Sequence, residues 1–198
     1  DGTSYTGDTA FGSGTELGTG NYAVYAGTSA SSVSVTGLNP STTYHVAVYE
    51  YNTTDTCYLT PALTGSFTTA SVTTVQFSTT SVSVAEDAGT YDLVIEIANE
   101  DALATTFDVV LTSGTAVDID SYTTQSETFP GNSSTDIMVT VTVTDDAIEE
   151  SDEVFTFEIQ NVAGGNSAAV GTNNSFDLTI LANDTPPITL PYTEDFSN

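Results

Sequence analysis

The sequence predicts an all-β protein built from two tandem antiparallel β-sandwiches. Apolar residues alternate with polar ones along short runs, and no run repeats apolar residues convincingly at helical spacing. Gly, Asn, Asp and Pro separate these runs, as turns do between strands. Val, Ile, Thr, Tyr and Phe are abundant beside 27 acidic residues in 198, so we expect the acidity to belong to a folded chain and not to a disordered one.

The charge composition excludes several partners. The chain has no Lys or Arg, and its formal net charge is −27. Without a cationic side chain it cannot pair with phosphates, which excludes nucleic acid and anionic membrane surfaces. No apolar run approaches the ~20 residues that span a bilayer, and no signal peptide is present. We therefore expect a mature piece or a fragment, without direct membrane insertion, whose acids form either a solvated surface or cation sites.

Little in the chain points to catalysis. Serine-hydrolase, zinc-protease and P-loop patterns are all missing from the sequence. The single histidine, His45, alternates with Tyr44 and Val46 and is therefore predicted to lie on the solvent face of a strand. The single cysteine, Cys57, cannot build an internal disulfide framework. The sequence predicts that the protein is not an enzyme.

Residues 1–70 are predicted to form the first module. The stretch GLNPSTTYHVAVYEYN places Leu38, Pro40, Thr42 and Tyr44 ahead of an alternating strand. This pattern resembles the second half of a fibronectin type III domain, and the residues before it resemble a variant common in secreted proteins of Bacteroidetes. The resemblance implies that the hydroxyl of Tyr44 bonds backbone a few residues upstream. Because the resemblance covers only the later strands of such a domain, we expect an open sheet edge and a partly exposed core in the first module.

A short Ser/Thr linker, residues 71–74, is expected between the modules. It follows a strand that ends at Thr68 or Thr69, and new strands begin around Val75 and Val82. A linker this short leaves limited hinge freedom.

Residues 75–184 are predicted to form the second module. Five alternating runs mark its clearest strands: Leu93–Ile97, Phe107–Leu111, Ile137–Val143, Phe155–Ile159 and Phe176–Ile180. Pro186-Pro187 cannot continue a central strand, so residues 185–198 are expected to be a tail or the start of a further module.

An acidic loop follows the strand Ile137–Val143. Acids crowd within it, among them Asp145, Asp146, Glu150, Asp152 and Glu153. Their mutual repulsion is costly unless a cation lies among them. Ca²⁺ takes six to eight oxygen ligands, and the strand Phe176–Ile180 would deliver further polar residues to the same end if the two strands run the same way.

The second module resembles a Calx-beta domain from end to end. This calcium-binding β-sandwich family matches VQFSTTSVSVAEDAGTYDLVIEI, GTAVDIDSYTT, TFPGN, VTVTDDAIEESDEVFTFEI and FDLTILAND in order. The resemblance implies calcium ligands at Glu86, at Asp145 or Asp146, at the Ile148 carbonyl, and at Glu150 and Glu153.

Two departures from the family pattern affect this ligand set. The Asp-Tyr pair expected after Gly-Thr-Ala stands here as Asp120-Ser121-Tyr122, one residue out of step, so Asp118 is another candidate. The closing acidic triplet is reduced to Ala182-Asn183-Asp184. We therefore expect one or two Ca²⁺ ions or weaker binding; the alternative is a scaffold that has lost calcium.

Three functions remain open at this point. The first is a pair of non-catalytic structural or adhesion modules of a secreted or cell-surface bacterial protein, which contact neighbouring modules, surface glycans or proteins. The second is a filament subunit, in which the tail residues Ile188–Tyr192 are donated head to tail to the open edge of a neighbouring subunit. The third is a carbohydrate-binding module that uses Tyr22, Tyr25, Tyr49 and Tyr51.

Overall fold

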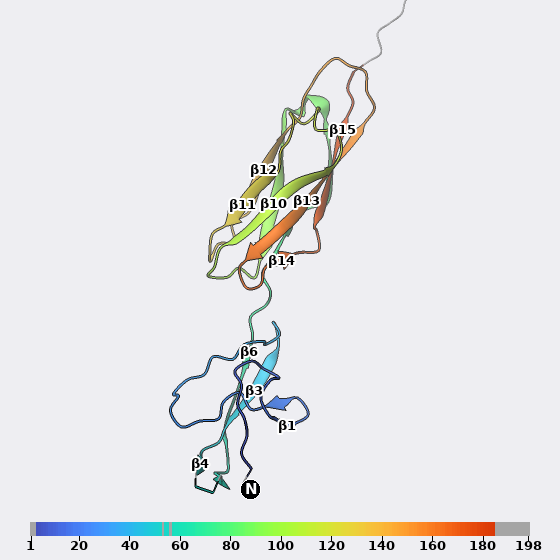
Figure 1. Ribbon diagram of the computed structural model, residues 1–198. Coiled ribbons are helices and arrows are strands. Elements are labelled where there is room, and N and C mark those ends of the chain that lie inside the picture. Colours follow the sequence, from blue (N-terminus) through green and yellow to red (C-terminus); the bar gives the residue numbers. More distant parts are fainter. Residues whose placement is uncertain (1–2, 53, 56, 185–198) are drawn as a thin grey trace, which may run out of the picture. The chain divides into compact units, whose positions relative to one another are not determined.

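The computed structural model describes residues 3–52, 54, 55 and 57–184 (Figure 1). The chain divides into two compact units, unit 1 (Asp1–Ser71) and unit 2 (Val72–Asn198). The regular elements of both units are strands, and the only helical element among the described residues is the 3₁₀ turn Glu86–Ala88, which confirms the all-β prediction. No helix in the described part of the chain is long and apolar enough to cross a membrane. The expected tail, residues 185–198, lies outside the described residues.

Unit 1 contains three two-stranded antiparallel ladders. They are β1 (Glu16–Gly18) with β2 (Asn21–Tyr22), β3 (Thr43–Val48) with β6 (Leu63–Thr68), and β4 (Tyr51–Asn52) with β5 (Cys57–Tyr58). The Tyr44 hydroxyl accepts a hydrogen bond from the Asn39 N–H at 3.0 Å, which is the corner contact expected of this tyrosine. His45 is exposed, also as expected.

Unit 2 is a sandwich of two sheets. One sheet has the order β11-β10-β13-β15-β8, and the other has the order β12-β9-β7-β14. The strand bounds are β7 (Thr74–Phe77), β8 (Ser81–Ala85), β9 (Thr90–Ala98), β10 (Thr105–Ser113), β11 (Gln125–Phe129), β12 (Ile137–Thr142), β13 (Glu153–Gly164), β14 (Ala169–Val170) and β15 (Ser175–Leu181).

The prediction of purely antiparallel sheets is wrong at two pairings. β8 runs parallel to β15, and β7 runs parallel to β14. The first strands of this unit lie in both sheets and pair there with its last strands. No hairpin joins such distant segments, so nothing local imposes an antiparallel pairing on them.

The core of unit 2 lies between the two sheets. The alternating residues predicted to face inward are buried or packed against the buried cluster, in all five of the predicted strands. Four core residues lie outside those runs: Val75, Phe77, Ile119 and Phe129. Aromatic rings also meet in the core. Phe77 and Phe176 come from different sheets and lie 5.6 Å apart, whereas Phe107 and Phe129 are neighbours in one sheet and lie 5.4 Å apart, both measured between ring centroids.

Candidate metal centre

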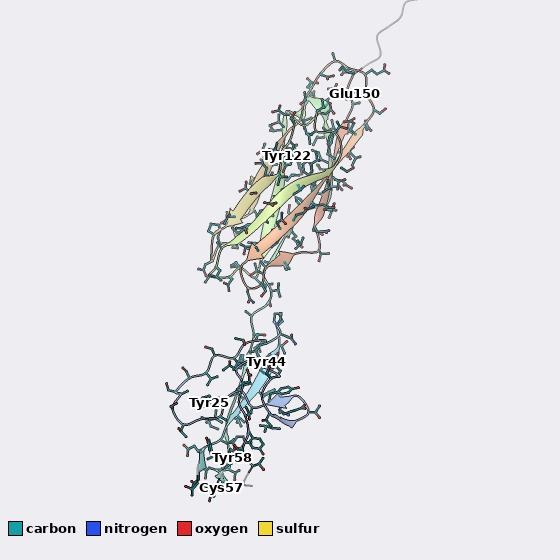
Figure 2. The ribbon with its side chains drawn as sticks, viewed as in Figure 1. Tyr25, Tyr44, Cys57, Tyr58, Tyr122 and Glu150 are labelled. Carbon is teal, nitrogen blue, oxygen red and sulfur yellow. The ribbon has the colours of Figure 1, made fainter. Side chains whose placement is uncertain are left out.

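Acidic residues meet at one end of the unit 2 sandwich, where Figure 2 labels Glu150. Glu86 follows β8, Asp146 follows β12 and Asp184 follows β15. These three carboxylates lie together, so the strands before them end at the same end of the sandwich, as the sequence argument required. Backbone hydrogen bonds join the loops there: the Val143 N–H donates to the Gly89 carbonyl, and the Thr144 N–H donates to the Asp118 carbonyl, both at 2.9 Å.

The first acid group consists of Glu86, Asp146 and Asp184. One carboxylate oxygen from each lies within 4.8 Å of the others. Glu86 is only 5% exposed. The Oδ2 atom of Asp184 is buried and has no hydrogen-bond partner among the described residues. A buried carboxylate oxygen without a partner is costly, and a cation would remove that cost.

The second acid group consists of Asp118, Glu150 and Glu153. Its ligand atoms also lie within 4.8 Å of one another. The loop that carries Asp118 is anchored by Tyr122, whose hydroxyl donates to the Val109 carbonyl at 3.0 Å. The Tyr122 ring also meets Phe157 edge-on at 5.1 Å. This anchor holds the loop between β10 and β11 against the core.

The electrostatics of the two groups are connected. Desolvation by neighbouring groups raises the pKa of the exposed Glu150, and the charges of Asp118, Asp146, Glu86 and Asp184 raise it further. Partial burial also raises the pKa of Glu153, followed by its hydrogen bond and charge interaction with Asp118. Glu150 therefore interacts with members of both groups, and no Lys or Arg exists in the chain to offset their charge.

The donor atoms suit Ca²⁺. Two oxygens that bind one Ca²⁺ at ~2.3–2.6 Å can be no more than about 5 Å apart, and both groups meet this condition. All six side chains offer carboxylate oxygens, which hard cations prefer and which softer transition metals do not require. Each group can supply three carboxylates, with water or backbone carbonyls left to complete six to eight ligands.

Three of the residues expected as ligands lie outside these two groups. Asp120 has a φ of 47° and lines a surface depression with Tyr122. Asp145 accepts a hydrogen bond from the Asn183 side chain at 3.4 Å. The Ile148 N–H donates to Asp146 Oδ1 at 2.7 Å, while its carbonyl as a ligand stays a prediction.

Asp152 has a supporting contact that the sequence argument did not identify. Its Oδ1 accepts a hydrogen bond from the Ala182 N–H at 3.1 Å, so the acidic loop is attached to the end of β15. The ladder between β13 and β15 places Glu153 opposite Ile180 and therefore brings Asp152 to that position. Only knowledge of this pairing could have identified the contact.

The fold and these acids define an immunoglobulin-like β-sandwich with clustered carboxylates, a candidate cation site, at one end. The family model of the Calx-beta domain matches residues 69–184, more than half of the chain. The chain belongs to the Calx-beta domain family.

One solved structure supports this fold. The crystal structure of the apo-form Calx CBD1 domain is 17% identical, with a TM-score of 0.50, and the match covers 57% of this chain and 99% of that one. A structure of CBD12 from CALX1.2 is also 17% identical, with a TM-score of 0.49, and the match covers 56% of this chain and 44% of that one. No curated protein matches the chain.

Proposed function

We propose that unit 2 is a calcium-binding module that holds one Ca²⁺ at each acid group. The observation that carries the proposal is the buried Asp184 Oδ2, which lacks a hydrogen-bond partner and lies beside Glu86 and Asp146. Bound calcium would neutralise the carboxylates. It would also join the ends of β8, β12 and β15 to the loops that carry Asp118 and Glu150.

Thermal melting in EDTA and in calcium tests this proposal. Extracellular calcium sites commonly have Kd values of ~10⁻⁴–10⁻³ M, so millimolar calcium adds on the order of 1 kcal/mol per site. For a domain of this size, each kcal/mol corresponds to a Tm increase of roughly 4 °C. We expect EDTA to lower the Tm and calcium to restore it. An unchanged Tm, with no calcium retained in equilibrium dialysis, would contradict the proposal.

We further propose a non-catalytic role as spacer or adhesion modules in a secreted or cell-surface bacterial protein. Weak sites of this type would fill at the millimolar calcium found outside cells and stiffen the module there. The corner contact of Tyr44 supports a fibronectin type III-like origin for unit 1. Antibody labelling of intact producing cells checks the location, and label that appears only after lysis would contradict it.

A carbohydrate-binding role is the second candidate, and an aromatic cluster in unit 1 supports it. The Tyr58 ring lies 5.6 Å from Tyr5, 6.4 Å from Tyr49 and 5.5 Å from Tyr51, and Tyr49 is 48% exposed. Tyr25, labelled in Figure 2 away from Tyr58, instead accepts hydrogen bonds from the Ser29 and Ala30 N–H groups.

Immobilised polysaccharides test this second candidate. We expect Tyr49→Ala to reduce retention and Tyr25→Ala to leave it unchanged. A parent chain that no polysaccharide retains removes this function.

A further inference from the structure

The ladder of β3 and β6 in unit 1 has one apolar face. Its register pairs Tyr44 with Phe67, Val46 with Gly65, and Val48 with Leu63, so these positions share a face. The opposite face is mostly polar and carries Thr43, His45, Ala47, Thr64, Ser66 and Thr68. The apolar side chains are open to solvent: Val46 is 43% exposed, Phe67 47%, Val48 57% and Leu63 76%.

Unit 1 covers only one end of this face. The Phe11 ring packs edge-on against Tyr44 at 5.1 Å, and Phe11 in turn meets Tyr22. At the centre of the face, a Cβ added to Gly65 would find no atom within 4 Å. Open space therefore lies over Gly65, and exposure increases from Val46 to Leu63 along the ladder.

The same ladder has free edges. In the described part of the chain, β3 and β6 form strand pairings only with each other. The Thr69 N–H donates to the Thr42 carbonyl, so by the alternation of an antiparallel pair the outward groups of β3 are those of Thr43, His45 and Ala47. Outward N–H and C=O groups of this kind pair with an added strand.

We propose that this apolar face and its free edge accept residues Ile188–Tyr192 of a second copy of the chain as an added strand. Ile188, Leu190 and Tyr192 alternate with Thr189 and Pro191, so an extended conformation turns the three apolar side chains to one side. In an addition parallel to β3, the backbone groups of Ile188, Leu190 and Tyr192 pair with the outward groups of Thr43, His45 and Ala47, while their side chains lie on the apolar face. The missing N–H of Pro191 then lies on the outer side, where it costs no ladder bond.

The charge distribution favours this contact. Unit 2 carries 22 of the 27 acids, whereas residues 185–193 carry none. Neither β3 nor β6 contains an acid. Donor and acceptor therefore meet without the direct like-charge repulsion that a net charge of −27 imposes elsewhere.

Val72 and Asp184 lie at opposite ends of the unit 2 sandwich. Unit 2 begins at Val72, beside Thr74, and Thr74 pairs with Ala98 at one end of β9. At the other end of β9, near the acid groups, Thr90 pairs with Thr142. β9 spans roughly 30 Å at ~3.3 Å per residue. Leu190 follows Asp184 by six residues and can reach at most about 21 Å. Donation of this segment to unit 1 of another copy makes a head-to-tail contact, which propagates as an open chain.

Sedimentation velocity of the full chain with millimolar calcium tests the proposal. All variants carry Cys57→Ser to remove disulfide exchange, and this parent is expected to form oligomers that grow with concentration. Leu190→Asp alters the donor, and Val48→Asp alters the acceptor. Each should raise the dissociation constant at least tenfold, because a charge replaces a buried apolar group. The matched controls are Thr193→Asp, beyond the donor segment, and Ser66→Asp, on the polar face of β6 away from the β3 edge. Each adds the same charge and should assemble as the parent does.

A mixing experiment separates donation between copies from pairing within one chain. Leu190→Asp keeps an intact acceptor and Val48→Asp keeps an intact donor, so their mixture should form a one-to-one dimer and nothing longer. A monomeric parent at every concentration, a Leu190→Asp variant that assembles undiminished, or a mixture that stays monomeric would each overturn the proposal. Should Val48→Asp fail to fold by circular dichroism, the comparison of Leu190→Asp with Thr193→Asp decides, because both positions lie outside the described residues.

Discussion

Single side chains decide which acids converge. The sequence left open the choice between Asp145 and Asp146 and between Asp118 and Asp120, and Asp146 and Asp118 are the ones that lie in the acid groups. Tyr122, held by the Val109 carbonyl, anchors the loop that contains both Asp118 and Asp120. Asp145 is engaged by Asn183 instead. Adjacent acids with the same chemistry are therefore separated by their local contacts.

Replacing Glu86 with Gln should have opposite effects with and without calcium. In EDTA, we expect Glu86→Gln to raise the Tm because one buried negative charge beside Asp146 and Asp184 is removed. The stability that millimolar calcium adds relative to EDTA should be smaller in Glu86→Gln than in the parent by on the order of 1 kcal/mol, the contribution of one site. Paired melting curves measure both effects.

Glu100→Gln is the matched control, since Glu100 is exposed between β9 and β10 and makes the same charge change outside both groups. Glu100→Gln should show the same Tm increase from EDTA to calcium as the parent protein. Full retention of that gain by Glu86→Gln would show that Glu86 is not a ligand.

Among the strands, β13 organises unit 2. It extends from Glu153 to Gly164 and pairs with both β10 and β15, so it connects the acid groups to the opposite end of the sandwich. Its last residue, Gly164, has a φ of +86°, and a Cβ there would run into the Ala104 carbonyl. The end of this strand therefore depends on glycine for two separate reasons.

Gly164→Ala should destabilise unit 2 by about 2 kcal/mol or more. A left-handed backbone costs a non-glycine residue roughly 1–2 kcal/mol, and displacement of the Ala104 carbonyl adds to this. Gly89→Ala is the control, because its φ is +75° but open space surrounds the new Cβ; it should show the backbone cost alone. Denaturant midpoints compare the two, and equal losses would mean that the close approach to Ala104 contributes nothing.

At the scale of the whole molecule, negative charge links stability to pH. In the absence of calcium, the folded-state pKa values of Glu150 and Glu153 are raised. The folded protein therefore binds protons more readily than the unfolded chain does. Stability is lost as the pH rises through these folded pKa values and is regained as the pH falls toward the unfolded values.

Acidification should therefore act in opposite directions in EDTA and in calcium. Between pH 7 and pH 5, we expect the Tm in EDTA to rise, while the additional Tm gained from calcium shrinks because protons compete for the same oxygens. Glu150→Gln should weaken both trends. Melting curves at several pH values measure them, and a Tm in EDTA that falls on acidification would contradict the raised pKa values.

The sequence by itself determined the all-β fold, the inward faces of the five strands of unit 2 and the acidic loop after Val143, because periodicity and local composition are carried by neighbouring residues. The Tyr44 corner could also be predicted, since its partner Asn39 is only five residues away. Tertiary structure alone decided that Glu86, Asp146 and Asp184 meet. Their convergence depends on strand order and on the parallel pairing of β8 with β15. This pairing joins strands that lie far apart in the sequence, so it leaves no local signal.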